Sequence, residues 1–274
     1  MTRWEQLGAA LDAAPGTVSV WAGRPGAPPW YARLPDAPHA AASTMKVAVL
    51  AALYRAAEAG VVDLDARLPV RNDFLSAAGD GELRYANDRE YDDEHEVWDR
   101  LGGTAPVRWL ARRMIVRSSN LATNLLLARV GKAVVAEVWR VAGATRSVTA
   151  RGIEDYAARD AGLDNVVTAA DLAVLFAALY DGALAGPVAT AEMLDLLAAQ
   201  EWRVDLAAGL PAGVRVAHKN GWMTGVRHSA GIVYPQDAPP YVVAVCTTSD
   251  ADDDGAACRL VAEVSAAAWQ ERAG

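Results

Sequence analysis

Cysteine is scarce in this sequence, and no long apolar run is present. The two cysteines among the 274 residues, Cys246 and Cys258, suit a reducing compartment, where a buried thiol behaves as a small hydrophobe. No segment approaches the roughly 20 apolar residues that cross a bilayer, and charges at Arg3, Glu5 and Asp12 interrupt any signal-peptide core. We therefore expect a cytoplasmic protein without a membrane partner, or a secreted one if the sequence is trimmed from a longer chain.

Positive charge is also in short supply. The formal net charge is -8 and no long basic run exists, which argues against nucleic acid as a partner. Hydrophobic residues make up 53% of the chain and charged residues 22%, enough to bury a large core in one domain or in two interlocked lobes. We expect a small-molecule or peptide-like substrate, and the sequence favours no particular oligomeric state.

The hydrophobic periodicity differs between the two ends of the chain and its middle. Strand patterns occur at residues 17–22, 30–33, 214–217, 230–234 and 241–247, with helices at 5–13 and 256–272. Helical patterns fill the middle, at 47–59, 107–115, 120–130, 134–141, 169–180 and 190–199. These patterns predict an α/β fold of the α+β type. Residues 1–42 and 206–274 form one lobe, a five-stranded antiparallel sheet with the terminal helices packed on it. Residues 43–205 form an all-helical lobe, and the active site lies between the two lobes.

The first candidate site is Ser43-Thr44-Met45-Lys46, at the start of a strongly apolar helix. A serine hydroxyl needs a base within hydrogen-bond reach to act as a nucleophile, and a lysine three residues on lies on the same helix face. The helix N-terminus also offers N–H groups to a developing negative charge. Taken alone, this spacing is more often a serine N-cap followed by a solvent-facing lysine.

The scarcity of lysine bears on this choice. Of the 26 basic residues only Lys46, Lys132 and Lys219 are lysines, and a buried lysine can act as a base whereas arginine cannot. Two of the three, Lys46 and Lys219, lie in segments that resemble catalytic motifs. A compositional bias toward arginine is the alternative explanation.

Two further motifs follow in chain order. Ser118-Ser119-Asn120 precedes an apolar helix that contains Asn124, and His218-Lys219-Asn220-Gly221-Trp222 lies at the end of a predicted strand. Together with the first motif, this order resembles the class A β-lactamases and penicillin-binding proteins over nearly the whole chain. Outside that context Ser118 is equally well explained as an N-cap, and Asn220-Gly221 as a hairpin turn.

The resemblance implies a set of roles. Ser43 would be the nucleophile, and Ser118 would relay a proton between the leaving group and the pair Lys46 and Lys219. Asn120 would bind the amide side chain of the substrate.

It also implies how the substrate is held. Lys219 would help to anchor a carboxylate, and the backbone N–H groups of Ser43 and Trp222 would hold the oxyanion. Gly221 would let the strand approach the substrate closely.

The sequence departs from the family where the acyl-enzyme is hydrolysed. Glu154 lies at a plausible distance after Ser118 to be the deacylating base, but Ala158 stands where the family has an asparagine partner. Asp155 or Asn165 are candidates to replace that asparagine. The alternative is that Glu154 is a solvated surface carboxylate.

A second departure lies in the Lys-Asn-Gly triplet. Asn220 stands where the family has a hydroxyl residue that binds the antibiotic carboxylate, so Arg227 and His228 on the next strand are candidates for an anion contact. The alternative is an ordinary charged strand edge.

The acidic stretch 88–96 precedes the second motif. This stretch could favour cationic substrates, or Tyr91 or Trp98 could act as a gate. The alternative is a solvated loop, which we favour.

No metal or cofactor is expected. The residues Asp250, Asp252, Asp254 and Gly255 resemble the start of a calcium loop, but Val261 occupies the position of the required glutamate. We interpret this segment as a turn and a helix N-cap.

These observations predict a serine hydrolase that forms a covalent acyl-enzyme on Ser43 from a β-lactam or a related amide or ester. One alternative is a cytoplasmic esterase, amidase, peptidase or transacylase of the same fold with little β-lactamase activity. Another is a penicillin-binding-like protein that acylates without turnover.

Overall fold

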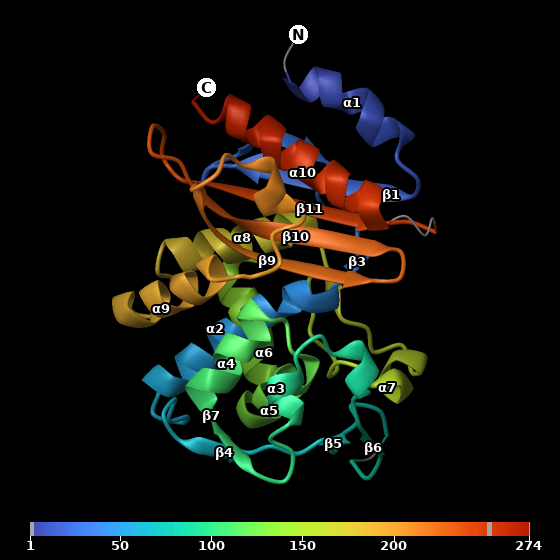
Figure 1. Ribbon diagram of the computed structural model, residues 1–274, viewed down its shortest axis with the longest axis vertical. Helices are drawn as coiled ribbons and strands as arrows, with labels where there is room; N and C mark the ends of the chain where they lie inside the picture. Colours follow the sequence, from blue (N-terminus) through green and yellow to red (C-terminus); the bar gives the residue numbers. More distant parts are fainter. Residues whose placement is uncertain (1–2, 80, 251–253, 274) are drawn as a thin grey trace.

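A five-stranded antiparallel sheet joins the two ends of the chain in the computed structural model, which describes residues 3–79, 81–250 and 254–273. The strand order is β2-β1-β11-β10-β9 (Figure 1). The strands are β1 (Thr17–Gly23), β2 (Pro29–Arg33), β9 (Arg215–Met223), β10 (Val226–Tyr234) and β11 (Tyr241–Thr248). The pairing of β1 with β11 runs from Thr17↔Thr248 to Gly23↔Val242. The predicted sheet is therefore confirmed.

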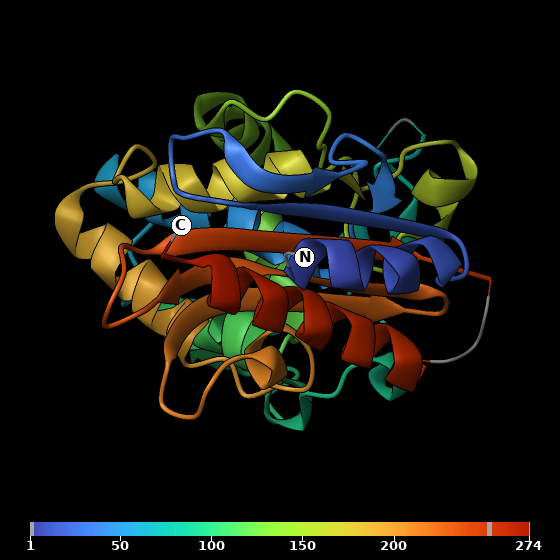
Figure 2. The ribbon, with the colours of Figure 1, turned by 90° about the horizontal axis from the view of Figure 1, so that it is seen from above.

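Helices cover both faces of this sheet. The terminal helices α1 (Arg3–Ala13) and α10 (Asp254–Glu271) lie side by side on one face, as Figure 2 shows from above. Helix α8 (Ala169–Tyr180), from the middle of the chain, packs on the other face against β1, β10 and β11. Seven of the eight residues of β11 are buried, because a central strand covered on both faces has no solvent-facing side.

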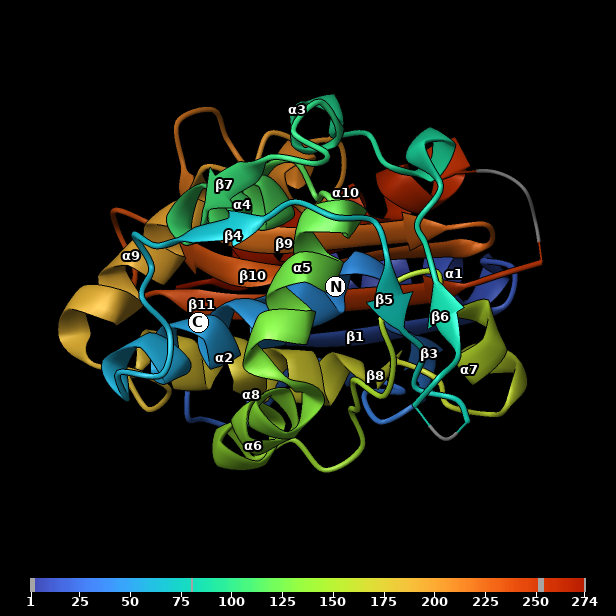
Figure 3. The same ribbon diagram turned by 90° about the horizontal axis from the view of Figure 1, so that it is seen from below.

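The helical part of the molecule surrounds α2 (Lys46–Glu58), in which 10 of 13 residues are buried. A helix that is apolar on every side can be stable only inside a core. Its neighbours include α4 (Val107–Val116), α5 (Asn120–Val130), α6 (Lys132–Ala142) and α9 (Pro187–Ala198). The view from below in Figure 3 shows α5 crossing α2. The N-terminal end of α2 is thereby fixed close to the sheet.

The middle of the chain contains short strands as well as helices, which differs from the all-helical expectation. Two pairs lie wholly within the middle, β4 (Arg67–Pro69) with β7 (Thr104–Pro106) and β5 (Phe74–Leu75) with β6 (Arg84–Tyr85), and β8 (Val166–Val167) pairs with β3 (His39–Ala40), which precedes the predicted helical lobe. Strands of two or three residues are too short to show an alternating pattern, so periodicity does not reveal them. Short helices α3 (His95–Trp98) and α7 (Tyr156–Asp160) complete the connections.

The expected turn at Asp250 to Gly255 includes residues 251–253, which lie outside the described residues, and α10 begins at Asp254. Within the described ranges, no helix is both long and apolar enough to cross a membrane.

Candidate active site

Ser43 lies in a short 3-10 turn, η1 (Ala42–Met45), that runs directly into α2. The preceding residue, Ala42, has φ 45°, a left-handed conformation that is strained for a residue with a Cβ. Ser43 itself is half-buried, so its hydroxyl is within reach of a ligand. The sequence interpretation of Ser43 as a residue at a helix start is correct.

Gly221 brings strand β9 against this turn. A Cβ atom on Gly221 would lie 2.7 Å from the backbone nitrogen of Ser43 and 3.0 Å from that of Thr44. Only glycine permits such an approach. The alternative of a hairpin turn at Asn220-Gly221 is wrong, because both residues lie inside β9 and the turn to β10 comes at residues 224–225.

Lys46 is fully buried, and its ammonium group has three oxygen neighbours. Nζ donates to the carbonyl oxygen of Ser118 at 2.6 Å, to the Ser118 hydroxyl at 3.3 Å and to Oδ1 of Asn120 at 2.9 Å. Burial lowers the pKa of Lys46 to about 7, although the negative charges of Asp92, Glu154 and Asp93 act in the opposite direction. Near neutral pH a substantial fraction of this amine is therefore unprotonated. The alternative of a solvent-facing lysine is wrong.

The hydroxyl groups of Ser118 and Ser119 have different partners. Ser119 caps α5, because its hydroxyl accepts a hydrogen bond from the backbone N–H of Ala122 at 3.1 Å. Ser118 has φ 61° and directs both its carbonyl and its hydroxyl to Lys46. The alternative that Ser118 is the N-cap is therefore wrong: the cap is its neighbour.

Lys219 is the second fully buried lysine. Its Nζ donates to the carbonyl oxygen of Asn220 at 2.8 Å and to Oδ1 of the same residue at 3.3 Å. Burial lowers its pKa well below the usual value, and the charge of Lys46 adds to the effect. The Asn220 amide is held from its other end as well, since Nδ2 donates to the Trp202 carbonyl at 3.0 Å. Both ends of the Asn220 side-chain amide are therefore occupied by hydrogen bonds within the protein.

Glu154 is buried and turned toward the same region. Its carboxylate accepts from the backbone N–H of Asp88 at 2.6 Å, from Asn87 Nδ2 at 3.0 Å and from Asn120 Nδ2 at 3.4 Å. Burial raises the pKa of Glu154. Asn120 therefore joins Glu154 at one end of its amide and Lys46 at the other. The alternative of a solvated surface carboxylate is wrong, because Glu154 is only 9% exposed.

Comparison with known proteins identifies the family of the chain. The model of a family described as the β-lactamase enzyme family matches residues 2–271. The chain belongs to this family. No curated protein sequence matches it.

Solved structures of the β-lactamase fold resemble the chain over almost its whole length. A β-lactamase from Sphaerobacter thermophilus is 26% identical with a TM-score of 0.82, over 98% of this chain and 97% of that one. An ancestral class A β-lactamase is 24% identical with a TM-score of 0.83, over 98% and 100%. A point mutant of PBP-A, described as an acyl-enzyme complex with penicillin G, is 24% identical with a TM-score of 0.78, over 98% and 95%. The chain thus has a class A β-lactamase-like fold.

This member of the β-lactamase family has an unexpected amide beside Glu154. Asp155 accepts hydrogen bonds from Ser76 Oγ at 2.6 Å and from the Ala77 N–H at 2.7 Å. Asn165 accepts from the Ala150 and Arg151 N–H groups and donates to Met45 Sδ and the Arg151 carbonyl. Both candidates are therefore used elsewhere in the fold, and the side-chain amide that contacts Glu154 besides Asn120 is that of Asn87. Nothing in the local sequence pattern indicated Asn87, which lies 67 residues earlier.

The structure argues against the prediction that Arg227 and His228 contact an anion in the active site. His228 is buried on the face toward Ser43, where Nδ1 accepts from the Thr247 N–H at 3.1 Å and Nε2 faces the Ala40 carbonyl at 2.9 Å. Burial lowers its pKa to about 4, so it is neutral and unsuited to an anion. Arg227 lies across from Trp222 on the neighbouring strand, with its guanidinium 5.4 Å from the indole centroid. It also pairs with Asp254 at 2.5 Å.

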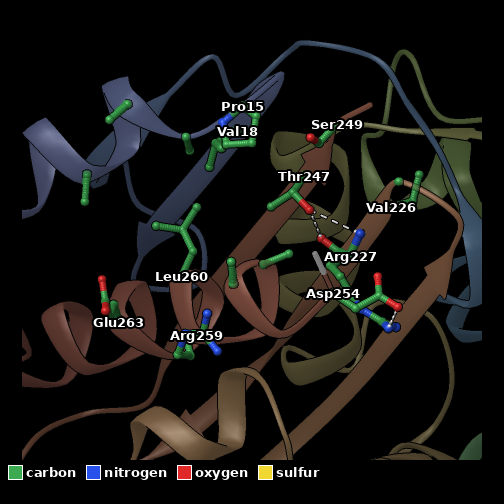
Figure 4. Close-up of a pocket in the computed structure, with 16 residues that line it drawn as sticks. Pro15, Val18, Val226, Arg227, Thr247, Ser249, Asp254, Arg259, Leu260 and Glu263 are labelled. Atoms are coloured by element: carbon green, nitrogen blue, oxygen red, sulfur yellow. Dashed lines mark hydrogen bonds and ion pairs between the residues drawn. The ribbon is translucent and has the colours of Figure 1, made fainter. Parts of the chain in front are cut away.

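The Arg227 side chain borders a pocket of about 270 Å³ between α1, α10 and the turn that joins β9 to β10 (Figure 4). Thr247 and Arg227 are joined there by two hydrogen bonds, from the Arg227 N–H at 3.1 Å and to its carbonyl at 2.7 Å. The pocket is lined by residues of α1 and α10, and these two helices lie on the opposite side of the sheet from α2 (Figure 1). It is not part of the candidate active site.

The acidic stretch 88–96 is only partly the solvated loop that we expected. Asp92 and Glu94 are each 2% exposed, whereas Tyr91 is 70% exposed. Trp98 is buried, and its indole N–H donates to Asp92 at 3.0 Å, so Trp98 is not a gate. Asp92 was missed by the sequence analysis because a run of acidic residues usually indicates a solvated surface.

Proposed function

We propose that this β-lactamase-family chain is a serine hydrolase that forms a covalent ester on Ser43 from a β-lactam or a related amide or ester. The observation that carries the proposal is the environment of Lys46: a fully buried amine with a pKa of about 7, in contact with Ser118 and Asn120, one helical turn from Ser43. Such an amine is matched to proton transfer near neutral pH.

In acylation, Oγ of Ser43 attacks the substrate carbonyl while its proton passes to unprotonated Lys46. The carbonyl oxygen becomes an oxyanion between the N–H groups of Ser43 and Trp222, which are brought near one another by the close packing of Gly221 on η1. The bond from the carbonyl carbon to the leaving nitrogen or oxygen then breaks. The leaving atom takes the Ser118 hydroxyl proton, which Lys46 replaces through their 3.3 Å contact.

In deacylation, Glu154 takes a proton from a water molecule that attacks the Ser43 ester. The raised pKa of Glu154 suits a general base, and the Asn120 amide holds the carboxylate near Lys46. The bond from the ester carbonyl carbon to Ser43 Oγ then breaks, Ser43 regains the proton that Glu154 took from the water molecule, and the acid product departs. The amide that supports Glu154 is Asn87 rather than a residue four positions further on.

A second candidate function is hydrolysis or transfer of a neutral ester or amide with little β-lactamase activity. Asn220 favours it, because its amide is already bonded to Lys219 and Trp202 where the family uses a hydroxyl for the antibiotic carboxylate. The ion pair of Arg227 with Asp254 points the same way. Acylation without turnover, the third candidate, would follow if the Asn87-supported Glu154 does not activate water.

The PBP-A mutant is described as an acyl-enzyme complex with penicillin G, which supports covalent chemistry on this fold. The direct test is to incubate the wild-type chain with a reactive β-lactam and, separately, with a fluorophosphonate, and to measure intact mass. We expect an adduct in the wild type and none in Ser43→Ala. Absence of an adduct with both reagents in the folded wild type would overturn the proposal.

Turnover separates the three candidates. A chromogenic cephalosporin and a simple ester are compared under the same conditions. Faster turnover of the cephalosporin supports a β-lactamase, faster turnover of the ester supports the second candidate, and a stable mass adduct with a single burst supports the third.

A further inference from the structure

The carboxylate of Asp92 is buried at the N-terminus of α5, directly behind the Ser118-Ser119-Asn120 motif. Its Oδ2 atom accepts hydrogen bonds from the Asn120 N–H at 3.0 Å, the Leu121 N–H at 2.9 Å, the Ser119 hydroxyl at 3.2 Å and the Trp98 indole at 3.0 Å. An ionised oxygen with four donors is strongly held, and the N-terminus of an 11-residue helix favours its charge.

These contacts lead to Lys46 through one residue. The backbone N–H of Asn120 is bound to Asp92, and the side-chain oxygen of Asn120 is bound to Lys46 Nζ at 2.9 Å. Ser118, which precedes the capping residue Ser119, has φ 61°, and its carbonyl oxygen also accepts a hydrogen bond from Lys46 Nζ. A turn with this strained backbone keeps its geometry only if its surroundings hold it, and Asp92 binds the two residues that follow Ser118.

We propose that Asp92 is a positioning residue for acyl transfer, which holds the Ser118–Asn120 turn against Lys46 and places a fixed negative charge near the Lys46 amine. The proposal rests on the proposed function of Ser43 and Lys46. Asp92 itself touches neither Ser43 nor Lys46 in any contact that the structure describes.

The charges around Lys46 determine what removal of Asp92 does. Asp92, Glu154 and Asp93 act as negative charges on Lys46, and Lys219 is the neighbouring cation. Asp92 raises the pKa of Lys46, and it also raises that of Glu154. Loss of its charge therefore lowers both pKa values. The acid limb of acylation follows Lys46 and therefore moves to lower pH, and the acid limb of deacylation follows Glu154 in the same direction.

Glu94 on the same loop provides a matched control. It is as buried as Asp92, and it lies 3.4 Å from Arg113 and 3.7 Å from Arg117 rather than at the Ser118–Asn120 turn. Replacement of Glu94 by glutamine removes a buried charge from the loop. The structure describes no hydrogen bond between the Glu94 side chain and α5, so this change leaves the contacts of α5 intact.

The first experiment compares the wild type, Asp92→Asn and Glu94→Gln. The observed rate of acylation by a reactive β-lactam is followed by mass across a pH series. We expect acylation of D92N to fall about tenfold to a hundredfold, the range of a displaced catalytic group. We also expect its acid limb to move down by about half a pH unit or more. E94Q should keep the wild-type limb. A folded D92N with the wild-type rate and limb would overturn the proposal.

The second experiment does not depend on activity. Because the chain has only three lysines, uniform ¹³C labelling of lysine yields three Cε signals that can be titrated by NMR and assigned with Lys132→Arg and Lys46→Arg. We expect the Lys46 titration to move to lower pH in D92N and to stay in place in E94Q, with the signal of exposed Lys132 the same in all. If the wild type never acylates, the proposed function fails, while this titration still decides whether Asp92 acts on Lys46.

A merely structural role for Asp92 would lower the melting temperature of D92N and leave both titrations unchanged, and that result would overturn the proposal. If D92N does not fold, Trp98→Phe removes one hydrogen bond to Asp92 and keeps its charge. We expect slower acylation with an unshifted acid limb, and an unchanged rate in W98F would overturn the positioning role.

Discussion

Lys46 and Ser118 are 72 residues apart in the sequence, yet a single ammonium group contacts both the carbonyl oxygen of Ser118 at 2.6 Å and its hydroxyl at 3.3 Å. This relationship gives the lysine two acceptors in a place where water does not reach it. A fully buried amine gives up its proton more readily than an exposed one, because burial penalises the charged form, and this is the property that a base for Ser43 requires.

Replacement of Lys46 by arginine should abolish most acylation. Arginine remains protonated at any accessible pH, so it cannot take the Ser43 proton, and we expect the acylation rate to fall by about 10²–10⁴-fold. The rate is measured by mass with a reactive β-lactam. Lys132→Arg makes the same chemical change at an exposed site and should have no effect, so an active K46R would contradict the role of Lys46.

The rate of acylation should depend on pH through the same amine. Only the unprotonated form of Lys46 accepts a proton, and its pKa is about 7. The rate should therefore fall as the pH decreases below about 7, by close to tenfold per unit once most of the amine is protonated. A rate that stays constant down to about pH 5.5 in the folded protein would show that Lys46 is not the base.

Replacement of Glu154 by glutamine should block the second half of the reaction. Glutamine keeps an oxygen that can accept from the Asp88 N–H but cannot deprotonate water, so the acyl-enzyme should accumulate. Intact mass during turnover should show most of the protein as the adduct, with turnover reduced by about 10²-fold or more. Glu137→Gln, at an exposed ion pair with Arg140, is the control that should turn over normally. Wild-type turnover in E154Q would identify a different base.

Replacement of Gly221 by alanine should damage the site without unfolding the protein. The new Cβ would lie 2.7 Å from the Ser43 nitrogen, so η1 or β9 must shift. Because a displacement of about 1 Å can cost about a hundredfold in rate, we expect a loss of that size in acylation. Gly8→Ala, in α1 with nothing within 4 Å of its added Cβ, should keep full activity and gain stability by about 0.5–1 kcal/mol. Equal rates for G221A and the wild type would show that this contact is unimportant.

Three buried histidines should make the protein sensitive to acid. Burial lowers the pKa of His39 and His228 to about 4 and that of His218 to about 3. In the unfolded chain these side chains titrate near 6.5, so between about pH 4 and 6.5 the unfolded state binds more protons. The free energy of unfolding should therefore decrease as the pH falls through this window, by up to about 1.4 kcal/mol per pH unit for each histidine.

Denaturant unfolding between about pH 4.5 and 7 measures this slope. Neither ring nitrogen of His218 has a hydrogen-bond partner among the described residues, so His218→Leu should reduce the slope by one histidine's share. Exposed His95 serves as the control, and H95Q should leave the slope unchanged. A slope in H218L equal to that of the wild type would contradict the buried, neutral state of His218.

Much of the fold followed from local patterns. The predicted ranges 120–130 and 169–180 coincide with helices α5 and α8, because each begins at a side-chain cap and has a continuous apolar pattern. Strand β9 was predicted too short, at residues 214–217 rather than 215–223, since His218, Lys219 and Asn220 are polar although all three are buried. Burial of polar residues through tertiary contacts is invisible to hydrophobic periodicity.

The sequence by itself determined the order of the elements, the sheet built from both chain ends, and the three motifs that bring Ser43, Lys46 and Lys219 into one candidate site. Local spacing and capping are sufficient for these, because they depend on residues a few positions apart. Only the tertiary structure decided that Ser119 is the cap, that Asn87 supports Glu154, and that Asp92 is buried behind Asn120. The contacts of Asn87 and Asp92 join segments 67 and 28 residues apart, and such partners are selected by packing rather than by any local pattern.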